Sequence, residues 1–106
     1  MDGCDIATDG DGYLENFSAW NEAVALAIAN CEGIELGPAH WEIVHLLREF
    51  YRRYEQSPAM RPLVKFVGQQ LGADKGNSIY LLKLFPGSPA KIASKIAGLP
   101  RPEHCL

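Results

Sequence analysis

The sequence predicts a single α+β domain, mostly helical, in which a small N-terminal β-hairpin packs on an array of about five helices and an extended C-terminal arm follows. Its length of 106 residues suits one compact domain. Turn-forming residues cluster near the N-terminus, whereas apolar residues recur at helical spacing through most of the remaining chain. We therefore divide the domain into a hairpin at residues 1–17, a helical array at 18–97 and a mobile arm at 98–106.

The hairpin is expected around the turn-forming run at residues 8–12 (TDGDG), because Tyr13 and Leu14 after it favour a strand. The aspartates of this run could also suggest a calcium-binding EF-hand loop. Such a loop requires a glutamate at its twelfth position. Counted from Asp9 that position is Trp20, so the sequence argues against a calcium site.

The first helix is expected to begin at a Ser18 cap and to end near Gly33, whose backbone can adopt the left-handed conformation. Residues 23–29 between them are apolar on every side, which is typical of a buried helix. Cys31, near the end of this helix, is expected to be a small core residue.

The later helices are also predicted from apolar spacing and from prolines. The second opens at Pro38, where the missing N–H costs nothing, and ends at Pro58. Its apolar stripe consists of Ile43, Val44, Leu47, Phe50, Tyr51 and Tyr54. A third helix has Pro62 in its first turn, and two more are expected over residues 77–85 and 89–97.

The chain changes character after Gly98. Pro100 and Pro102 follow Leu99 and Arg101 in turn. A proline has a fixed φ and favours extended backbone angles in the residue before it. An extended segment over residues 99–106 would reach about 25 Å. We therefore expect an arm hinged at Gly98 that carries Cys105 near its tip.

The three cysteines, Cys4, Cys31 and Cys105, form no CxxC pair. A disulfide framework or a zinc site would require a different pattern, so we expect reduced thiols, no metal and no cofactor. His40 and His45 are five residues apart on one helix and do not share a face; both are expected at the surface. Cys105 stands out because an exposed thiol is a chemical liability.

The chemistry open to Cys105 is narrow, since only the thiolate is nucleophilic. Arg101 and His104 would favour the thiolate, whereas Glu103 and the terminal carboxylate would oppose it. The arm offers neither a general base nor an oxyanion hole. The sequence therefore indicates a carrier whose thiol is activated inside a partner's site, in preference to a complete enzyme.

Charge is distributed unevenly, although the net charge is only −3. Residues 1–37 hold eight acids and no Lys or Arg, whereas residues 75–106 hold five bases and one acid. Such asymmetry indicates that the basic end faces an acidic or anionic partner. The candidate contact residues are Arg61, Lys83, Lys91, Lys95 and Arg101.

Other functional classes find less support. No run of about 18 apolar residues is present to span a membrane, and the N-terminus lacks the features of a secretory signal, so we expect a cytoplasmic protein without direct membrane contact. Residues 38–72 could form a helix-turn-helix, which leaves a DNA-binding regulator as an alternative. Its second helix carries only Arg61 and Lys65 as positive charges, fewer than phosphate binding requires.

Several motifs, spread in order over nearly the whole chain, resemble those of one known family. They are residues 38–42 (PAHWE), 57–61 (SPAMR), 75–78 (KGNS), 84–86 (LFP) and 95–106 (KIAGLPRPEHCL). On these motifs the chain resembles the DsrC/TusE family of sulfur carriers.

The resemblance implies a small hairpin or meander packed on a helical array, with a mobile C-terminal arm. It also implies that the penultimate cysteine, Cys105, accepts sulfur as a persulfide and passes it on. The arm and its hinge would be formed by Gly98, Leu99, Pro100 and Pro102. If such carriage is counted as catalysis, the protein would be a sulfurtransferase that needs no cofactor beyond the cysteine persulfide.

Family members that serve dissimilatory sulfite reductase carry a second cysteine upstream of the penultimate one. Here that position, eleven residues before Cys105, is Ser94, and a hydroxyl cannot form a disulfide. The resemblance therefore favours the TusE-like branch, in which the carrier takes sulfur from a TusBCD-like complex and hands it to the enzyme that 2-thiolates the wobble uridine of tRNA. A DsrC-like partner of sulfite reductase or of sulfur oxidation remains the alternative.

Overall fold

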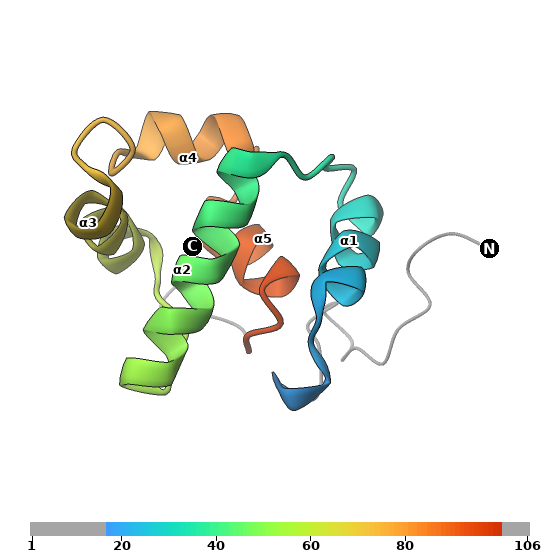
Figure 1. Cartoon of the computed structure of the whole chain (residues 1–106). Coiled ribbons are helices and arrows are strands. Elements are labelled where there is room, and N and C mark those ends of the chain that lie inside the picture. Colours follow the sequence, from blue (N-terminus) through green and yellow to red (C-terminus); the bar gives the residue numbers. More distant parts are fainter. Residues whose placement is uncertain (1–16, 101–106) are drawn as a thin grey trace.

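The computed structural model describes residues 17–100, and residues 1–16 and 101–106 lie outside this part. The described chain forms a short 3-10 helix, η1 (Phe17–Ala19), followed by five α-helices (Figure 1). The α-helices are α1 (Glu22–Cys31), α2 (Pro38–Tyr54), α3 (Met60–Leu71), α4 (Ser78–Leu84) and α5 (Pro89–Ile96). Within this part, no helix is long and apolar enough to cross a membrane.

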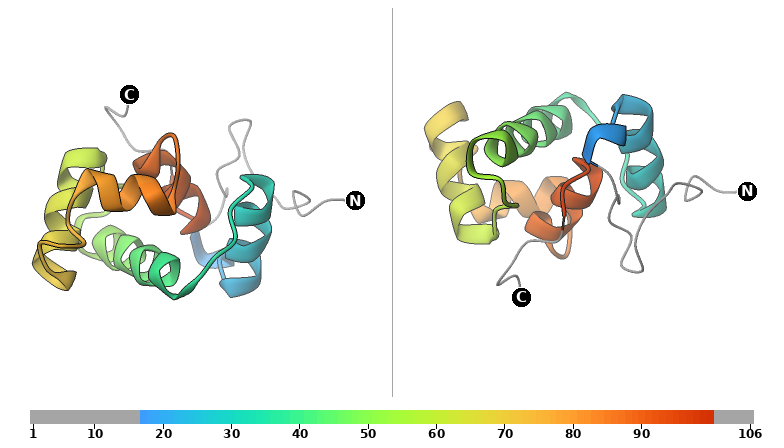
Figure 2. Two further views of the ribbon diagram at one scale, coloured as in Figure 1. Left: turned by 90° about the horizontal axis from the view of Figure 1, so that it is seen from above. Right: turned by 90° about the horizontal axis from the view of Figure 1, so that it is seen from below.

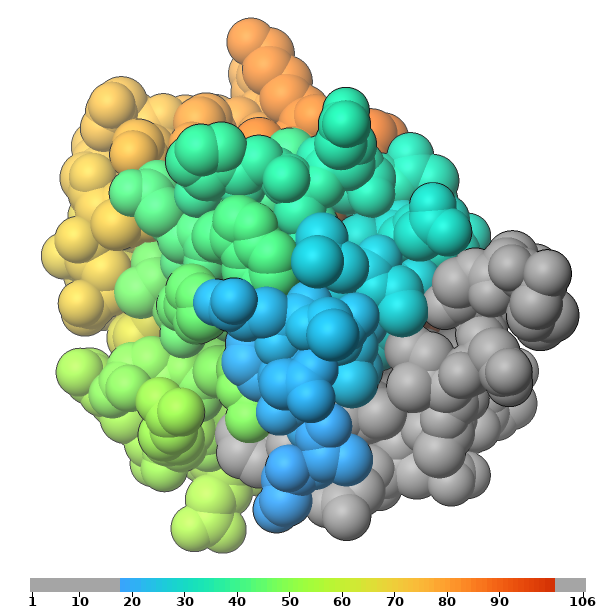
Figure 3. Space-filling view, turned by 45° about the vertical axis from the view of Figure 1, so that its right-hand side comes forward, coloured from blue at the N-terminus to red at the C-terminus, as the bar shows by residue number. Residues whose placement is uncertain are grey.

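The last helix, α5, is the centre of the array. It packs against each of the other four α-helices, and Figure 2 shows it between α1 on one side and α3 with α4 on the other. In Figure 3, η1, α1 and α2 form much of the visible surface, and α5 is almost completely hidden. Its buried residues are small or medium-sized: Pro89, Ala90, Ala93, Ser94 and Ile96. Small side chains allow several helices to approach one short helix closely.

Helix α1 differs in two ways from the prediction. Its N-cap is Asn21, whose side-chain Oδ1 accepts the Val24 N–H at 2.9 Å, and not Ser18. The helix is also not buried all round, because only one face meets the core and Leu26 on another face is 51% exposed. An apolar composition therefore does not by itself show how many sides of a helix are covered.

Helix α2 has the apolar face that the sequence predicts. Ile43, Val44 and Leu47 are completely buried, and Pro38 occupies the first turn. Tyr54, at the end of the predicted stripe, is 54% exposed. The unexpected member of the buried face is a charged residue, Arg48.

The turn between α3 and α4 brings two backbones into contact. Gly76 packs so tightly on Gly68 of α3 that an added Cβ would overlap its backbone. Asn77 then caps α4, since its Oδ1 accepts the Tyr80 N–H at 2.8 Å. Lys75 Nζ binds Glu42 Oε1 at 3.0 Å and ties this turn to α2. The motif at residues 75–78 is therefore explained by packing and capping.

The predicted α+β class is wrong. The described residues 17–100 contain helices and no strand, because their apolar residues recur with the helical period and not with the alternation of a strand. The predicted hairpin covered residues 1–17. Its last residue, Phe17, begins η1, and residues 1–16 lie outside the described part.

The Gly68–Gly76 contact leads to a test of the packing. In Gly76→Ala the new Cβ would lie 2.5 Å from the Gly68 nitrogen. The overlap can be relieved only if α3 and the turn that holds residue 76 move apart. We expect a loss of about 2–3 kcal/mol in the free energy of unfolding, measured by urea denaturation.

The matched control is Gly37→Ala, whose Cβ would meet only His40 Nδ1, at an ordinary 3.8 Å. Its loss is expected to stay below about 1 kcal/mol, as for glycine at a helix N-cap. Equal stability of Gly76→Ala and the unmodified protein would contradict the close backbone contact.

Candidate functional site

Three of the site residues predicted from the sequence, Cys105, Arg101 and Pro102, lie outside the described part of the chain. The structure does describe the point from which the C-terminal segment starts. We call residues 98–100 the root of the arm. The surroundings of the root define where Cys105 is tethered to the domain.

The root closes α5 and does not form a free hinge. Gly98 has a left-handed φ of +74° and packs against the Trp20 ring, where an added Cβ would lie 2.5 Å from Cδ1. The Gly98 N–H donates to the Lys95 carbonyl at 3.0 Å, and the Leu99 N–H donates to the Ser94 carbonyl at 2.9 Å. These are the two hydrogen bonds of a Schellman C-cap.

Leu99 is completely buried in the core, whereas the sequence predicts it in an extended arm. In a Schellman motif the residue after the left-handed glycine makes an apolar contact with the helix it ends, which accounts for its burial. Bending the chain at Gly98 would pull Leu99 out of the core. Any projecting arm therefore begins no earlier than Pro100, which is exposed.

Three side chains from separate parts of the chain donate hydrogen bonds to backbone carbonyls in the root or in the two residues before it. The pairs are Trp20 Nε1 to Ile96 O at 2.8 Å, Arg48 Nη1 to Ala97 O at 2.7 Å, and Ser57 Oγ to Pro100 O. We call Trp20, Arg48 and Ser57 the clamp. Trp20 precedes α1, Arg48 lies on α2, and Ser57 lies between α2 and α3.

Arg48 is the most constrained member of the clamp. Its side chain is on the buried face of α2, and its guanidinium carbon lies 4.2 Å from the centre of the Trp20 ring, a cation–π distance. Burial, with a smaller contribution from the nearby charge of Arg52, lowers the pKa of Arg48 from its usual range to about 10. Arg48 therefore stays charged at neutral pH, and its charge faces the negative end of the α5 dipole.

The clamp was not predicted from the sequence, although Arg48 carried a signal. It follows Val44 by four residues and precedes Tyr51 by three, so the helical period places it on the apolar stripe of α2. Trp20 and Ser57 lie outside the α-helices, where no period indicates the direction of a side chain.

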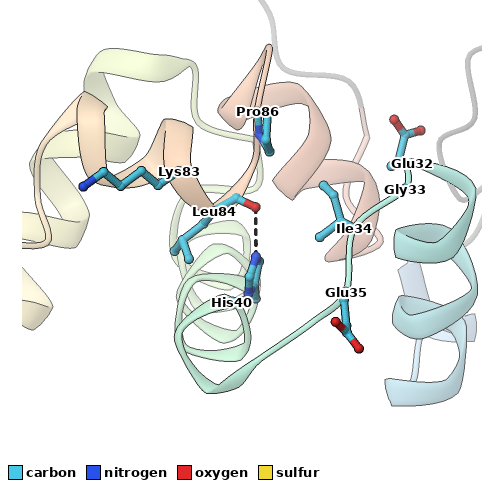
Figure 4. Close-up of a pocket in the computed structure, with 8 residues that line it drawn as sticks. All are labelled: Glu32, Gly33, Ile34, Glu35, His40, Lys83, Leu84 and Pro86. Carbon is cyan, nitrogen blue, oxygen red and sulfur yellow. Dashed lines mark hydrogen bonds between the residues drawn. The ribbon is translucent and has the colours of Figure 1, made fainter.

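A surface pocket lies between the connection from α1 to α2 and the end of α4. Its lining residues are Glu32, Gly33, Ile34, Glu35, His40, Lys83, Leu84 and Pro86 (Figure 4). His40 Nδ1 accepts the Gly37 N–H at 3.1 Å, which leaves Nε2–H to donate to the Leu84 carbonyl at 2.9 Å. Because both ring nitrogens are engaged, His40 ties α2 to α4 and is not the surface histidine that the sequence predicts.

His45 does lie at the surface, as predicted. Its ring stacks on Trp41 with a centroid distance of 5.9 Å and meets the edge of Trp20 at 6.1 Å. Trp41 and Trp20 are half-buried against the core. The aromatic residues of this face therefore support the packing of α2 against the segment that holds the clamp.

The predicted basic contact residues lie on several elements. Arg61 is exposed on α3, which lies across α5 from α1 (Figure 2), and Lys83 is exposed on α4. Lys91 and Lys95 are half-buried on α5, and Lys95 Nζ binds Glu32 Oε2 at 3.2 Å. Lys83 lines the same pocket as Glu32. The structure thus pairs Lys95 with an acid and leaves Arg61 on another face.

A family model described as DsrC like protein matches residues 1–106. The chain belongs to the DsrC-like family. A sulfurtransferase TusE homolog from Haemophilus influenzae is 55% identical over 106 residues, which cover 100% of this chain and 97% of that protein. The resemblance to the DsrC/TusE family that the sequence motifs predict is therefore confirmed.

Solved structures of the family share the fold. The NMR structure of Allochromatium vinosum DsrC has a TM-score of 0.85 at 47% identity and covers 93% of this chain and 88% of that one. The oxidized gamma-subunit of the dissimilatory sulfite reductase (DsrC) from Archaeoglobus fulgidus has a TM-score of 0.81 at 40% identity, with coverage of 95% and 92%. The helical array described above is thus that of the DsrC-like family.

Ser94, which replaces the upstream cysteine that the resemblance implies for the sulfite-reductase branch, is completely buried in α5. Its hydroxyl has no hydrogen-bond partner among residues 17–100. A buried hydroxyl without a partner lowers stability, since it has given up its bonds to water. The described residues around Ser94 therefore bury its hydroxyl without a polar group to bond it.

Cys31 differs from the expectation of a reduced core thiol. It is exposed at the last residue of α1 and is disulfide-bonded. Cys31 therefore lies at an exposed helix end and not in the core.

The two buried serines near the root are expected to respond in opposite directions. Ser94→Ala removes a hydroxyl without a partner and should leave the free energy of unfolding unchanged or raise it by up to about 1 kcal/mol. Ser57→Ala removes the donor to the Pro100 carbonyl and should lower it by about 1 kcal/mol. Urea denaturation of both variants measures the difference, and a clear loss of stability in Ser94→Ala would show that its hydroxyl is bonded.

Proposed function

We propose that this protein is a sulfur-relay carrier that accepts sulfane sulfur as a persulfide on Cys105 and passes it to an acceptor. The observation that carries the proposal is the match to the DsrC-like family over the whole chain, with a relative named as a sulfurtransferase TusE homolog at 55% identity. The sequence keeps a cysteine at the penultimate position, five residues after a root that the domain holds in place.

The proposed transfer consists of two displacements at sulfur. The Cys105 thiolate attacks the outer sulfur of a donor persulfide, R–S–SH; the donor S–S bond breaks, and the donor leaves as the thiolate R–S⁻. Cys105 then carries –S–SH. An acceptor thiolate attacks this outer sulfur in turn and releases the Cys105 thiolate, so that the carrier undergoes no net oxidation.

The root itself, residues 98–100, carries no ionisable side chain. Arg48 beside it is engaged by the Ala97 carbonyl and the Trp20 ring, and His40, on α2, is engaged at both nitrogens. The groups that activate the thiol are therefore expected in the partners. This supports a sulfurtransferase that works as a relay between two other proteins.

The chain length limits how far the thiol reaches from the domain. Cys105 is the fifth residue after Pro100, and a fully extended chain spans at most about 3.6 Å per residue, or roughly 18 Å in total. This is shorter than the reach predicted from the sequence, because Gly98 and Leu99 belong to the domain. Partners must therefore bring their reactive sulfur close to the connection between α2 and α3, where Ser57 holds Pro100.

For the acceptor, we favour the enzyme that 2-thiolates the wobble uridine of tRNA, with a TusBCD-like complex as donor. Support comes from the relative named as a TusE homolog and from Ser94, which leaves Cys105 without the upstream cysteine of the sulfite-reductase branch. A DsrC-like role beside dissimilatory sulfite reductase is the second candidate, because a subunit of that enzyme shares the fold. The family match gives no support to a DNA-binding regulator.

Cys105 is expected to be the residue that carries the sulfur. Incubation with cysteine, a cysteine desulfurase and its relay proteins should add about 32 Da per sulfur atom to the intact mass. The adduct should be lost in Cys105→Ser and retained in Cys4→Ser and Cys31→Ser. If the adduct survives in Cys105→Ser, another residue carries the sulfur and the proposal is wrong.

The acceptor can be identified in a reconstituted relay. With a TusBCD-like donor and the tRNA-thiolating enzyme present, the unmodified protein should raise the rate of 2-thiouridine formation at least about tenfold over Cys105→Ser, as expected for loss of a covalent carrier. Nucleoside mass spectrometry measures the product. Equal rates with both proteins would argue against tRNA thiolation and would direct attention to sulfite reductase.

A further inference from the structure

We propose that the clamp residues Trp20, Arg48 and Ser57 are positioning residues for sulfur transfer, because they fix the point at which the C-terminal segment leaves the domain. The inference rests on the proposed function of Cys105 as a sulfur carrier. It assigns a role in the transfer to three residues that lie at the root of the segment and not on it.

The backbone carbonyls at the end of α5 show how completely the root is held. Three of them are satisfied by the backbone itself: Ala97 N–H donates to Ala93, Gly98 N–H to Lys95 and Leu99 N–H to Ser94. Three further carbonyls between residues 96 and 100, those of Ile96, Ala97 and Pro100, each receive one clamp side chain. Helix ends normally leave such carbonyls to water or to caps, so this many directed donors indicates a root with one defined path.

The clamp residues also depend on one another. The Arg48 guanidinium lies over the Trp20 ring, and Gly98 packs on the same tryptophan so tightly that no Cβ fits. Loss of either side chain would free the other as well as one carbonyl. Ser57 acts separately, because it holds Pro100 at the outer end of the root.

The position of the root matters because the segment beyond it is short. Cys105 lies five residues after Pro100, so any freedom of the root is passed directly to the thiol. A tethered group that searches a larger volume has a lower effective concentration at a partner's site. A fixed root therefore raises the rate of transfer within a complex without changing the surface on which the partner docks.

The first test measures the root itself by amide hydrogen exchange. In Arg48→Met, exchange at Gly98 and Leu99 should become about tenfold faster or more, since a charged donor to the neighbouring carbonyl is lost. Exchange in the middle of α2, α3 and α4 should stay within about twofold of the unmodified protein. Arg52→Met is the matched control, because Arg52 lies one turn further on the same helix and is exposed.

The second test measures transfer. Single-turnover transfer from persulfide-loaded protein to the acceptor protein should slow about tenfold in Arg48→Met, with KM within about twofold. Loading of Cys105 by inorganic polysulfide, which needs no docking, should stay unchanged. Arg48→Lys should restore part of the rate, because it keeps the charge but not the planar stacking on Trp20.

If Arg48→Met does not fold, Ser57→Ala and Trp20→Phe replace it, since each removes one hydrogen-bond donor and little volume. Slower transfer with faster exchange confined to the root supports the proposal. Unchanged transfer in folded variants whose root exchanges faster overturns it, as does faster exchange throughout the domain in every variant. Failure of the unmodified protein to accept sulfur on Cys105 would instead refute the carrier function, and the exchange results would still report on the root.

Discussion

The bond from the Arg48 guanidinium to the Ala97 carbonyl joins the longest helix to the end of the central one, and the rest of the structure depends on it. A buried guanidinium is costly to remove from water. Here the carbonyl, the Trp20 ring and the negative end of the α5 dipole offset that cost together. The same charge satisfies the carbonyl of Ala97, a residue that is completely buried, as is Leu99. The burial of the residues that end α5 and the charge of Arg48 therefore depend on each other.

The central position of α5 explains why the end of this helix can serve as a firm base. A C-terminal helix at the edge of a fold can detach with little loss, whereas α5 contacts all four other α-helices. Its small buried residues, Ala90, Ala93 and Ser94, permit this crowding. Displacement of the root would therefore disturb the whole core. The segment that carries Cys105 leaves from the best-held helix of the domain, although it is itself the end of the chain.

The helices could be predicted from the sequence, because apolar spacing and helix-ending glycines and prolines act locally. The arrangement at the root could not. The rule for residues before proline places Leu99 in extended backbone, but it does not show that the side chain after a left-handed Gly98 turns back into the core. Likewise Ser18 is a good capping residue by type, yet Asn21 makes the cap. Cys105 was predicted from the proline-rich arm together with the family motifs, and it lies outside the described residues.

A sulfur carrier must satisfy two opposing physical demands. The persulfide reacts only with groups that a partner supplies, so the thiol must reach into the partner's site. Transfer within a complex is nevertheless fastest when the thiol samples a small volume. In this chain the two demands are met by different residues. Residues up to Pro100 are anchored through Trp20, Arg48 and Ser57, and only the last six residues remain for delivery. A longer free segment would reach more partners but dilute the thiol at each, and a fully anchored one could not enter a partner's site. Because the clamp holds residues 96–100, it sets both how far the Cys105 thiol can reach and how high its effective concentration is at a partner's site.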